Sequence, residues 1–80
     1  MTIVNYMTWN YNRFMISYAP LWRTLKEKGV STYTLIHKYQ ISSATIDRMK
    51  KGNGISTAKI DDLCRILGCR VEDIIEYERE

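Results

Sequence analysis

The sequence is poor in the residues that mark several large classes of protein. Among its 80 residues it has one proline, one histidine and two cysteines, Cys64 and Cys69. Two cysteines are too few for a disulfide framework, and no CxxC pair or neighbouring histidine pair gives the spacing of a metal site. We therefore expect two reduced cysteines packed as small apolar groups, and no bound metal.

Long apolar runs and glycine-rich loops are missing as well. No stretch approaches the roughly 20 apolar residues that a membrane-spanning helix needs, and the N-terminus lacks the basic start and apolar segment of a signal peptide. The chain has no glycine-rich phosphate loop, and His37 has no Cys, Ser or carboxylate partner at catalytic spacing. We expect a cytoplasmic protein that is not an enzyme, contacts no membrane, and needs no cofactor or small-molecule ligand.

Charge is distributed unevenly along the chain, whose net charge is +3. Between Arg23 and Lys59 there are eight basic residues against two acidic ones, a local charge of +6. Between Glu72 and Glu80 there are five acidic residues against one arginine, a local charge of −4. A basic middle indicates contact with a polyanion, whereas the acidic tail faces elsewhere.

Apolar residues recur at helical spacing between the punctuating glycines, serines and the proline. Pro20 suits the first turn of a helix, and Gly29 suits a left-handed C-terminal cap. Ser31, Ser42 and Ser56 are good N-caps. These signals predict four helices and a last short helical turn, over residues 19–28, 32–39, 43–51, 57–67 and 71–75.

The pattern also predicts which residues face the core and where strands form. Leu35, Ile36 and Tyr39 are available for the core from the second helix, and Ile46 and Met49 from the third. Residues 14–18, FMISY, and residues 74–78, IIEYE, are strand-like. We expect these two segments to pair, either within the chain or across a dimer.

The second and third predicted helices are joined only by residues 40–42. So short a link forces the helices to cross steeply, which is helix-turn-helix geometry, and in that unit the second helix lies in the major groove of DNA. Its first residues are all small, which lets a helix N-terminus approach DNA closely, and its free N–H groups and dipole favour phosphate oxygens. These residues are Ser42, Ser43, Ala44 and Thr45.

The outer face of this helix suggests individual contacts. Arg48 is the best candidate for bidentate recognition of guanine, and Ala44 can touch a thymine methyl group. Asp47 can accept a hydrogen bond from cytosine or restrain Arg48. Lys50 and Lys51, with Lys59 nearby, are expected to hold phosphates without reading sequence.

Residues 15–77 resemble the helix-turn-helix domains of the phage-repressor, Cro-like or Xre-like family, in its compact branch. The matching elements are GVSTYTLIHKYQISSATIDRMKKG, STAKIDDLCRILG and VEDII. The resemblance implies an all-α, compact five-helix domain, with short terminal strands possible, that binds duplex DNA as a homodimer on a two-fold symmetric site. By position it implies a phosphate contact for Thr32 and a backbone contact for Lys51. It implies a base-reading face made of Ser42, Ser43, Ala44, Asp47 and Arg48. The candidate DNA-binding residues are Thr32, Ser42, Ser43, Ala44, Thr45, Asp47, Arg48, Lys50 and Lys51.

Three positions depart from the family pattern. Gln40 stands where the turn often has glycine, which costs about 1 kcal/mol if the residue must be left-handed. Ile36 replaces a smaller residue, which loosens or shifts the packing of the two helices. Lys50 stands where an acidic residue is common.

These observations give a division of the chain and two alternative functions. We predict an N-terminal extension, residues 1–14, that is partly disordered, followed by a helix-turn-helix domain, residues 15–80. We expect a sequence-specific, double-stranded DNA-binding transcriptional regulator that acts as a repressor, reads the major groove with the helix over 43–51, and forms a homodimer with the last strand as candidate interface. The alternative is a protein-interaction module, such as an antitoxin-like partner or adaptor, that uses the aromatic N-terminus and the IIEYE edge.

Overall fold

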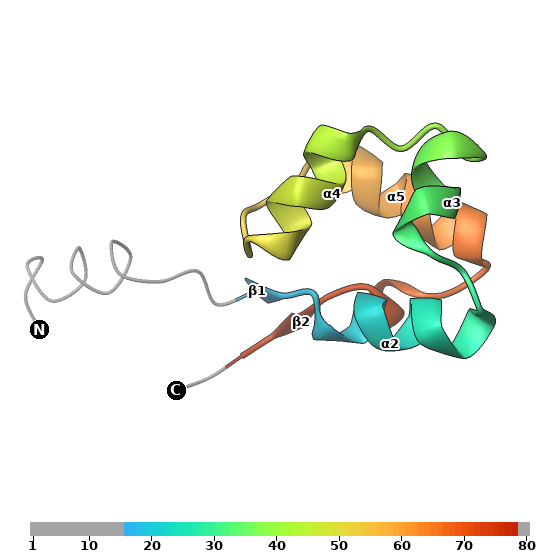
Figure 1. Ribbon diagram of the computed structural model, residues 1–80. Helices are drawn as coiled ribbons and strands as arrows, with labels where there is room; N and C mark the ends of the chain where they lie inside the picture. Colours follow the sequence, from blue (N-terminus) through green and yellow to red (C-terminus); the bar gives the residue numbers. More distant parts are fainter. Residues whose placement is uncertain (1–15, 79–80) are drawn as a thin grey trace, which may run out of the picture.

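Four α-helices form the body of the protein in the computed structural model, which describes residues 16–78 (Figure 1). The predicted extension over residues 1–14 lies outside the described residues. In chain order the elements are β1 (Ile16–Ser17), α2 (Ala19–Lys28), α3 (Thr32–His37), α4 (Ser43–Lys50), α5 (Thr57–Leu67), the 3-10 helix η1 (Val71–Asp73) and β2 (Glu76–Tyr77).

The first helix begins and ends where the sequence predicts. Pro20 lies in the first turn of α2, and Gly29 closes the helix in the left-handed conformation, at φ 68°. The N–H of Val30 donates to the carbonyl of Leu25 over 2.9 Å, which satisfies a carbonyl at the helix end and directs the chain toward α3. Leu25 is buried on the core side of the helix.

The second helix is shorter than predicted, because α3 ends at His37 and not at Tyr39. The chain then passes through Gln40, whose φ is 65°. This left-handed turn brings the N–H of Ile41 to the carbonyl of Leu35 over 3.0 Å and buries the Ile41 side chain. The folded protein therefore carries the cost of about 1 kcal/mol that a residue other than glycine incurs in the left-handed conformation.

Tyr39 does not reach the core, contrary to the prediction. Its side chain is 37% exposed, because α3 ends before it and the chain turns away. Nζ of Lys38 lies 5.3 Å from the centroid of its ring. Leu35 is buried and Ile36 half-buried, as predicted for the core face of this helix.

The next two helices follow the predicted boundaries to within one residue. Ser42 caps α4, which ends one residue before the predicted Lys51. Ser56 caps α5, and Gly68 ends it in the left-handed conformation, at φ 61°. In both helices the serine hydroxyl accepts a backbone N–H of the first turn, which supplies an acceptor that the helix itself cannot provide.

The last short helical turn that the sequence predicts is present as a three-residue 3-10 turn, η1, so the fifth helix that the resemblance implies is not confirmed as an α-helix. The carbonyl of Asp73 accepts the hydroxyl of Thr24 over 2.8 Å, and its carboxylate accepts the N–H of Arg70 over 3.1 Å. The first bond holds η1 against α2, and the second caps its first turn. The described chain is therefore mostly helical, with four α-helices and a short sheet.

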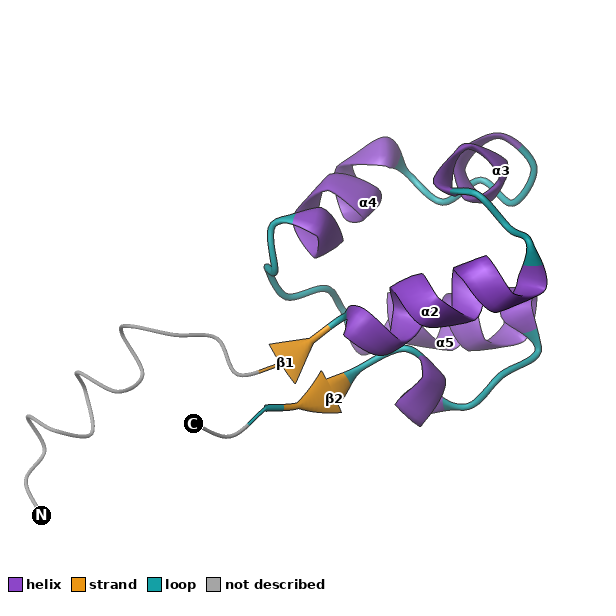
Figure 2. Ribbon diagram, turned by 60° about the horizontal axis from the view of Figure 1, so that its bottom comes forward, coloured by secondary structure: helices purple, strands orange, loops and turns teal. Residues whose placement is uncertain are grey.

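The two strands lie side by side near the ends of the described chain (Figure 2). They pair antiparallel, with Ile16 opposite Tyr77 and Ser17 opposite Glu76. The predicted pairing of the two strand-like segments is confirmed, and it occurs within the chain. Between residues 16 and 78, no helix has the length and apolar character that crossing a membrane requires.

One hydrophobic core draws on all four helices and on the segment after η1. Its fully packed members are Tyr18, Leu21, Leu25, Leu35, Ile41, Ile46, Met49, Leu63, Leu67 and Ile74. α3 and α4 lie together on one side of the molecule, and α2 and the sheet lie on the other (Figure 1). The core thus anchors α4 by one face and leaves its other face outward.

Candidate nucleic-acid interface

The start of α4 is fixed by a side-chain cap. Oγ of Ser42 accepts the backbone N–H of Thr45 over 3.1 Å and lies 2.9 Å from the Thr45 hydroxyl. Thr45 is only 8% exposed. Of the predicted DNA-binding residues, Thr45 therefore lies on the inner side of α4, and its hydroxyl is used inside the protein, whereas Ser42 remains exposed.

The outer face of α4 carries most of the remaining candidates. Ile46 and Met49 are buried, which confirms that they face the core. The other residues of the face share exposure to solvent, and they are Ser43, Ala44, Asp47, Arg48 and Lys50, followed by Lys51 at the helix end. Small residues thus lie at the N-terminal end of the face and basic residues at its C-terminal end, which suits entry of a helix into the major groove.

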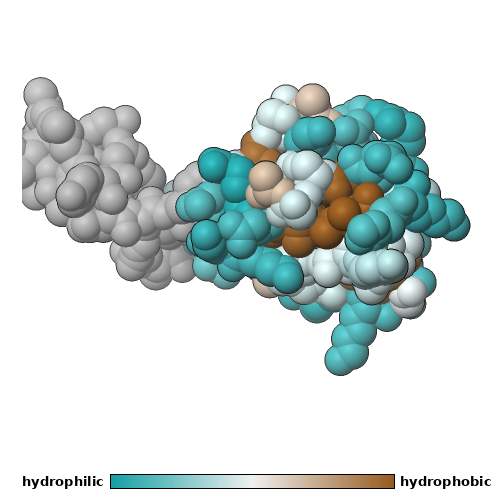
Figure 3. Space-filling view, turned by 45° about the horizontal axis from the view of Figure 1, so that its top comes forward, coloured by the Kyte–Doolittle hydropathy of each residue, from teal (hydrophilic) through white to brown (hydrophobic). Residues whose placement is uncertain are grey.

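A groove of about 470 Å³ runs between α3 and α4. Figure 3, which brings this side forward, shows apolar atoms in a hollow among polar ones. The half-buried Ile36 lines the groove together with Ile46 and with five of the nine candidates. Those five are Thr32, Ser43, Ala44, Asp47 and Lys50.

Arg48 is exposed but is tethered at one nitrogen. Its Nε donates to the carbonyl of Gly54 over 2.9 Å, in the loop that follows α4. Among the described residues no other hydrogen bond restrains the guanidinium, so its terminal Nη groups are available as donors.

A second tether on the same loop comes from Tyr18, whose OH donates to the carbonyl of Asn53 over 2.7 Å. Tyr18 is buried, and burial raises the pKa of its hydroxyl, which keeps the donor protonated. Nothing in the local sequence pattern signals this contact, because it joins residues 35 positions apart.

The charges on α4 are partly paired. Nζ of Lys51 lies 3.0 Å from the carboxylate of Asp47. The sequence suggested that Asp47 could restrain Arg48, but in the structure its ion-pair partner is Lys51. Both side chains are more than half exposed, and such pairs contribute only about 0–1 kcal/mol. A phosphate oxygen can therefore replace Asp47 as the partner of Lys51 at little cost.

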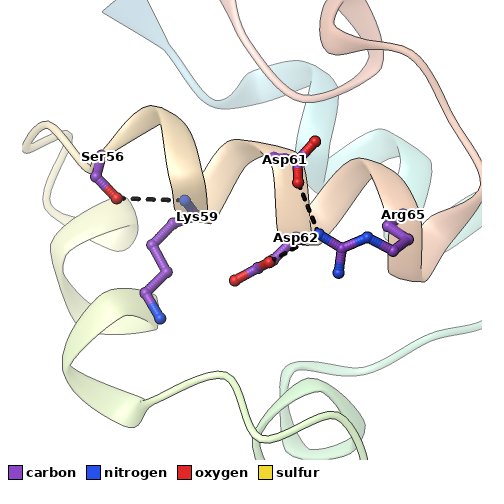
Figure 4. Close-up of polar contacts among 5 residues, drawn as sticks. All are labelled: Ser56, Lys59, Asp61, Asp62 and Arg65. Carbon is purple, nitrogen blue, oxygen red and sulfur yellow. Dashed lines mark hydrogen bonds and ion pairs between the residues drawn. The ribbon is translucent and has the colours of Figure 1, made fainter.

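α5 carries further charged residues, of which Lys59 lies nearest α4 (Figure 4). The side chain of Lys59 extends toward α4 (Figure 4). Arg65 donates to Asp61 over 2.6 Å and to Asp62 over 3.2 Å, so the two adjacent aspartates share one arginine. Within residues 16–78, no group of three or more His, Cys, Asp or Glu side chains is placed to hold a metal ion.

The order of the helices and the residues around the turn match a known family. Residues 20–80 match the model of the Cro/C1-type helix-turn-helix DNA-binding domain. The chain belongs to this family. The resemblance seen in the sequence is thereby confirmed, and this Cro/C1-type domain is a DNA-binding domain of the kind found in regulators of transcription.

The fold of this Cro/C1-type domain also has a solved counterpart. It is similar to the crystal structure of the transcriptional regulator VanUg, form II, with a TM-score of 0.75 and 27% sequence identity over 82% of this chain and 88% of that one. No curated protein matches the chain.

A protein-interaction module, the alternative function, would use the edge of the last strand, β2. One edge of β2 pairs with β1 of the same chain. The aromatic residues of the N-terminus, which that function also invokes, lie outside the described residues. No contact among the described residues favours a protein-interaction module over DNA binding.

Proposed function

We propose that this protein is a sequence-specific transcriptional repressor that binds double-stranded DNA as a homodimer and reads the major groove with α4. The observation that carries the proposal is the exposed outer face of α4, which is small at its N-terminal end and basic at its C-terminal end. Its inner face is held by Ile46 and Met49 in the core, so the helix can enter a groove without unfolding.

The first turn of α4 makes the closest approach to the bases. Ser43 and Ala44 add little bulk, so the helix N-terminus and its N–H groups can come near the DNA backbone. The methyl group of Ala44 suits contact with a thymine methyl, and the Ser43 hydroxyl can donate to or accept from a base edge. We expect Thr32, which lines the same groove, to bind a phosphate with its hydroxyl.

Arg48 supplies the strongest specific contact in this account. The bond from its Nε to Gly54 leaves the two Nη groups to donate to O6 and N7 of one guanine. Because one nitrogen is already held, the guanidinium loses less rotational freedom on binding than an unrestrained arginine does.

Lys50 and Lys51 bind phosphates that flank the major groove of the DNA. Each neutralised phosphate releases counterions from DNA, so affinity falls steeply as salt rises. Lys51 exchanges Asp47 for the phosphate, and Asp47 is then free to accept from the amino group of a cytosine.

A homodimer follows from the size of the site. One α4 reads only a few base pairs, and two copies on half-sites about 34 Å apart double the contacts. Repression then results because a dimer bound at a promoter blocks the polymerase. Sedimentation of the full chain with and without a two-fold symmetric duplex tests the dimer, and in vitro transcription from a template carrying the site tests repression.

The binding mode is tested with duplexes selected from random DNA by the full-length protein. We expect Arg48→Ala to weaken binding by about 1–3 kcal/mol and to relax preference at one guanine position. Arg23→Ala, an equal charge loss on α2, is expected to leave preference unchanged. A uniform loss at every base position in Arg48→Ala would show that the loop tether, and not a base contact, was removed, and would contradict the proposal.

The phosphate contacts have a matched test of their own. Lys50→Ala is expected to reduce the salt dependence of binding by about one counterion, without changing sequence preference. Lys26→Ala removes the same charge from α2 and is expected to leave the slope unchanged. If the slope of log affinity against log salt concentration is the same in the two variants, DNA does not contact Lys50 on α4.

A further inference from the structure

The end of α5 brings the two cysteines of the described chain together. Gly68 is left-handed, and the N–H groups of Gly68 and Cys69 both donate to the carbonyl of Cys64, the second over 3.1 Å. The bond from Cys69 is the six-to-one bond that marks a Schellman motif, in which the residues at the positions of Cys64 and Cys69 face each other across the helix end, and the bond from Gly68 is that of the simpler left-handed cap. Both cysteines line the same groove, and we call Cys64 and Cys69 the thiol pair.

The end of α2 shows what these positions normally hold. Gly29 is left-handed there, and Leu25 and Val30 occupy the two facing positions. An apolar pair is the usual occupant, and two aliphatic side chains provide it in α2. α5 shares with α2 the left-handed glycine and the bond donated by the residue after it, with two oxidisable sulfur atoms in place of the aliphatic side chains.

The thiol pair is open to small reagents. Both cysteines are half-buried and line a groove of about 500 Å³ along α5, together with Ile60, Val71 and Ile75. This groove shares no lining residue with the groove between α3 and α4. A small molecule can therefore reach the sulfur atoms without crossing the proposed DNA-binding face.

We propose that the thiol pair is a dithiol–disulfide site, at which a low-molecular-weight disulfide oxidises Cys64 and Cys69 to an intrachain disulfide that fastens the linker after Gly68 to the end of α5. One cysteine, as a thiolate, attacks a sulfur of the small disulfide, forms a mixed disulfide and releases one small thiol. The second cysteine then attacks the protein sulfur of that bond and releases the other small thiol. The two cysteines lose two electrons and two protons, which the two small thiols carry away.

The folded chain favours this reaction over the unfolded chain. The backbone bonds from Gly68 and Cys69 to the carbonyl of Cys64 already hold the two cysteines at the same helix end. Formation of the disulfide therefore needs no large movement of the backbone. In an unfolded chain the same closure costs loop entropy. We expect the equilibrium constant for disulfide formation to be larger in the native chain by on the order of tenfold or more.

The test measures this constant in the full chain with glutathione as the redox probe. Native and urea-unfolded protein are equilibrated with mixtures of oxidised and reduced glutathione, alkylated, and analysed by mass spectrometry. The expected result is an intrachain disulfide with the larger constant in the native chain, whereas Cys64→Ser and Cys69→Ser each form only a mixed disulfide. A native constant no larger than the unfolded one, or accumulation of the mixed disulfide in the unmutated chain, would overturn the proposal.

Two valine variants separate the motif from the mere presence of thiols. Gly68→Val and Gly29→Val each place a β-branched residue at a left-handed position with open space around its Cβ. Circular dichroism establishes that each variant is folded. Gly68→Val is expected to lower the native constant toward the unfolded value, and Gly29→Val to leave it unchanged. An unchanged constant in Gly68→Val would show that the motif does not align the thiol pair.

Discussion

Replacing Gln40 with glycine is expected to stabilise the fold. Gln40 is exposed and has a φ of 65°, a conformation that costs an L-amino acid about 1–2 kcal/mol and that glycine adopts freely. The residue lies in the turn that joins α3 to α4. The strain therefore lies in the turn that sets the position of α4, the helix proposed to read DNA.

The expected gain is smaller than the strain itself. Glycine gives the unfolded chain more conformations, which costs about 0.4–1 kcal/mol of stability. Taken at the middle of both ranges, the difference leaves a net gain of about 0.5–1 kcal/mol for Gln40→Gly. For a domain of 60–100 residues, 1 kcal/mol corresponds to roughly 4–8 °C, so Tm should rise by about 2–8 °C.

Thermal unfolding followed by circular dichroism measures this change, with two control variants. Lys38→Gly replaces another exposed residue of the same connection, but at a right-handed φ of −94°, and should lower stability by about 0.5–1 kcal/mol. Gln40→Ala keeps the strain and should change stability by less than about 0.5 kcal/mol. If Gln40→Gly lowers Tm as Lys38→Gly does, the attribution of strain to this turn is wrong.

Three further predictions concern the contacts around α4 and the thiol pair. Ser42→Ala removes the helix cap and should cost about 1 kcal/mol in urea unfolding, whereas Ser43→Ala should cost less than about 0.5 kcal/mol; equal losses would contradict the cap. Tyr18→Phe removes the donor to Asn53 and should cost about 1 kcal/mol, so an unchanged urea midpoint would show that this bond contributes nothing. Burial raises the pKa of both thiols of the pair above the ordinary 9.0, so their contribution to stability is fully present below pH 9.0 and is lost as pH rises through the folded-state pKa. Replacing both with alanine should make the alkaline loss of stability smaller, and an equal loss would contradict this assignment.

Helix ends were the features that the sequence predicted best. Ser42 and Ser56 begin helices, and Gly29 and Gly68 end them, as expected. Each of these signals is local, because a serine hydroxyl bonds to an N–H three residues away and a glycine adopts its own left-handed conformation. Such rules require no knowledge of the rest of the fold.

Two features that the sequence did not reveal depend on hydrogen bonds made by the folded chain. Tyr39 was expected in the core, but α3 ends before it and the N–H of Ile41 bonds to the carbonyl of Leu35. The hydroxyl of Thr24, on α2, bonds to the carbonyl of Asp73, 49 positions away. Neither bond has a sequence pattern that identifies it.

The candidate site was predictable to the level of a helix face. The inward position of Ile46 fixes by helical periodicity which side of α4 is outward. The state of individual side chains was not predictable, because Arg48 is tethered to a loop and Asp47 pairs with Lys51. These details decide which nitrogen atoms and carboxylates remain for a partner.

The central claim is that the outer face of α4 enters the major groove, and methylation of guanine N7 tests it most directly, because N7 lies in that groove. The selected duplex is treated with dimethyl sulfate in the presence of the protein. The account predicts protection of at least one guanine N7 in each half-site, lost in Arg48→Ala and retained in Arg23→Ala at saturating protein. Tight, specific binding that leaves every guanine N7 reactive, or a protection pattern that Arg48→Ala does not change, would contradict it.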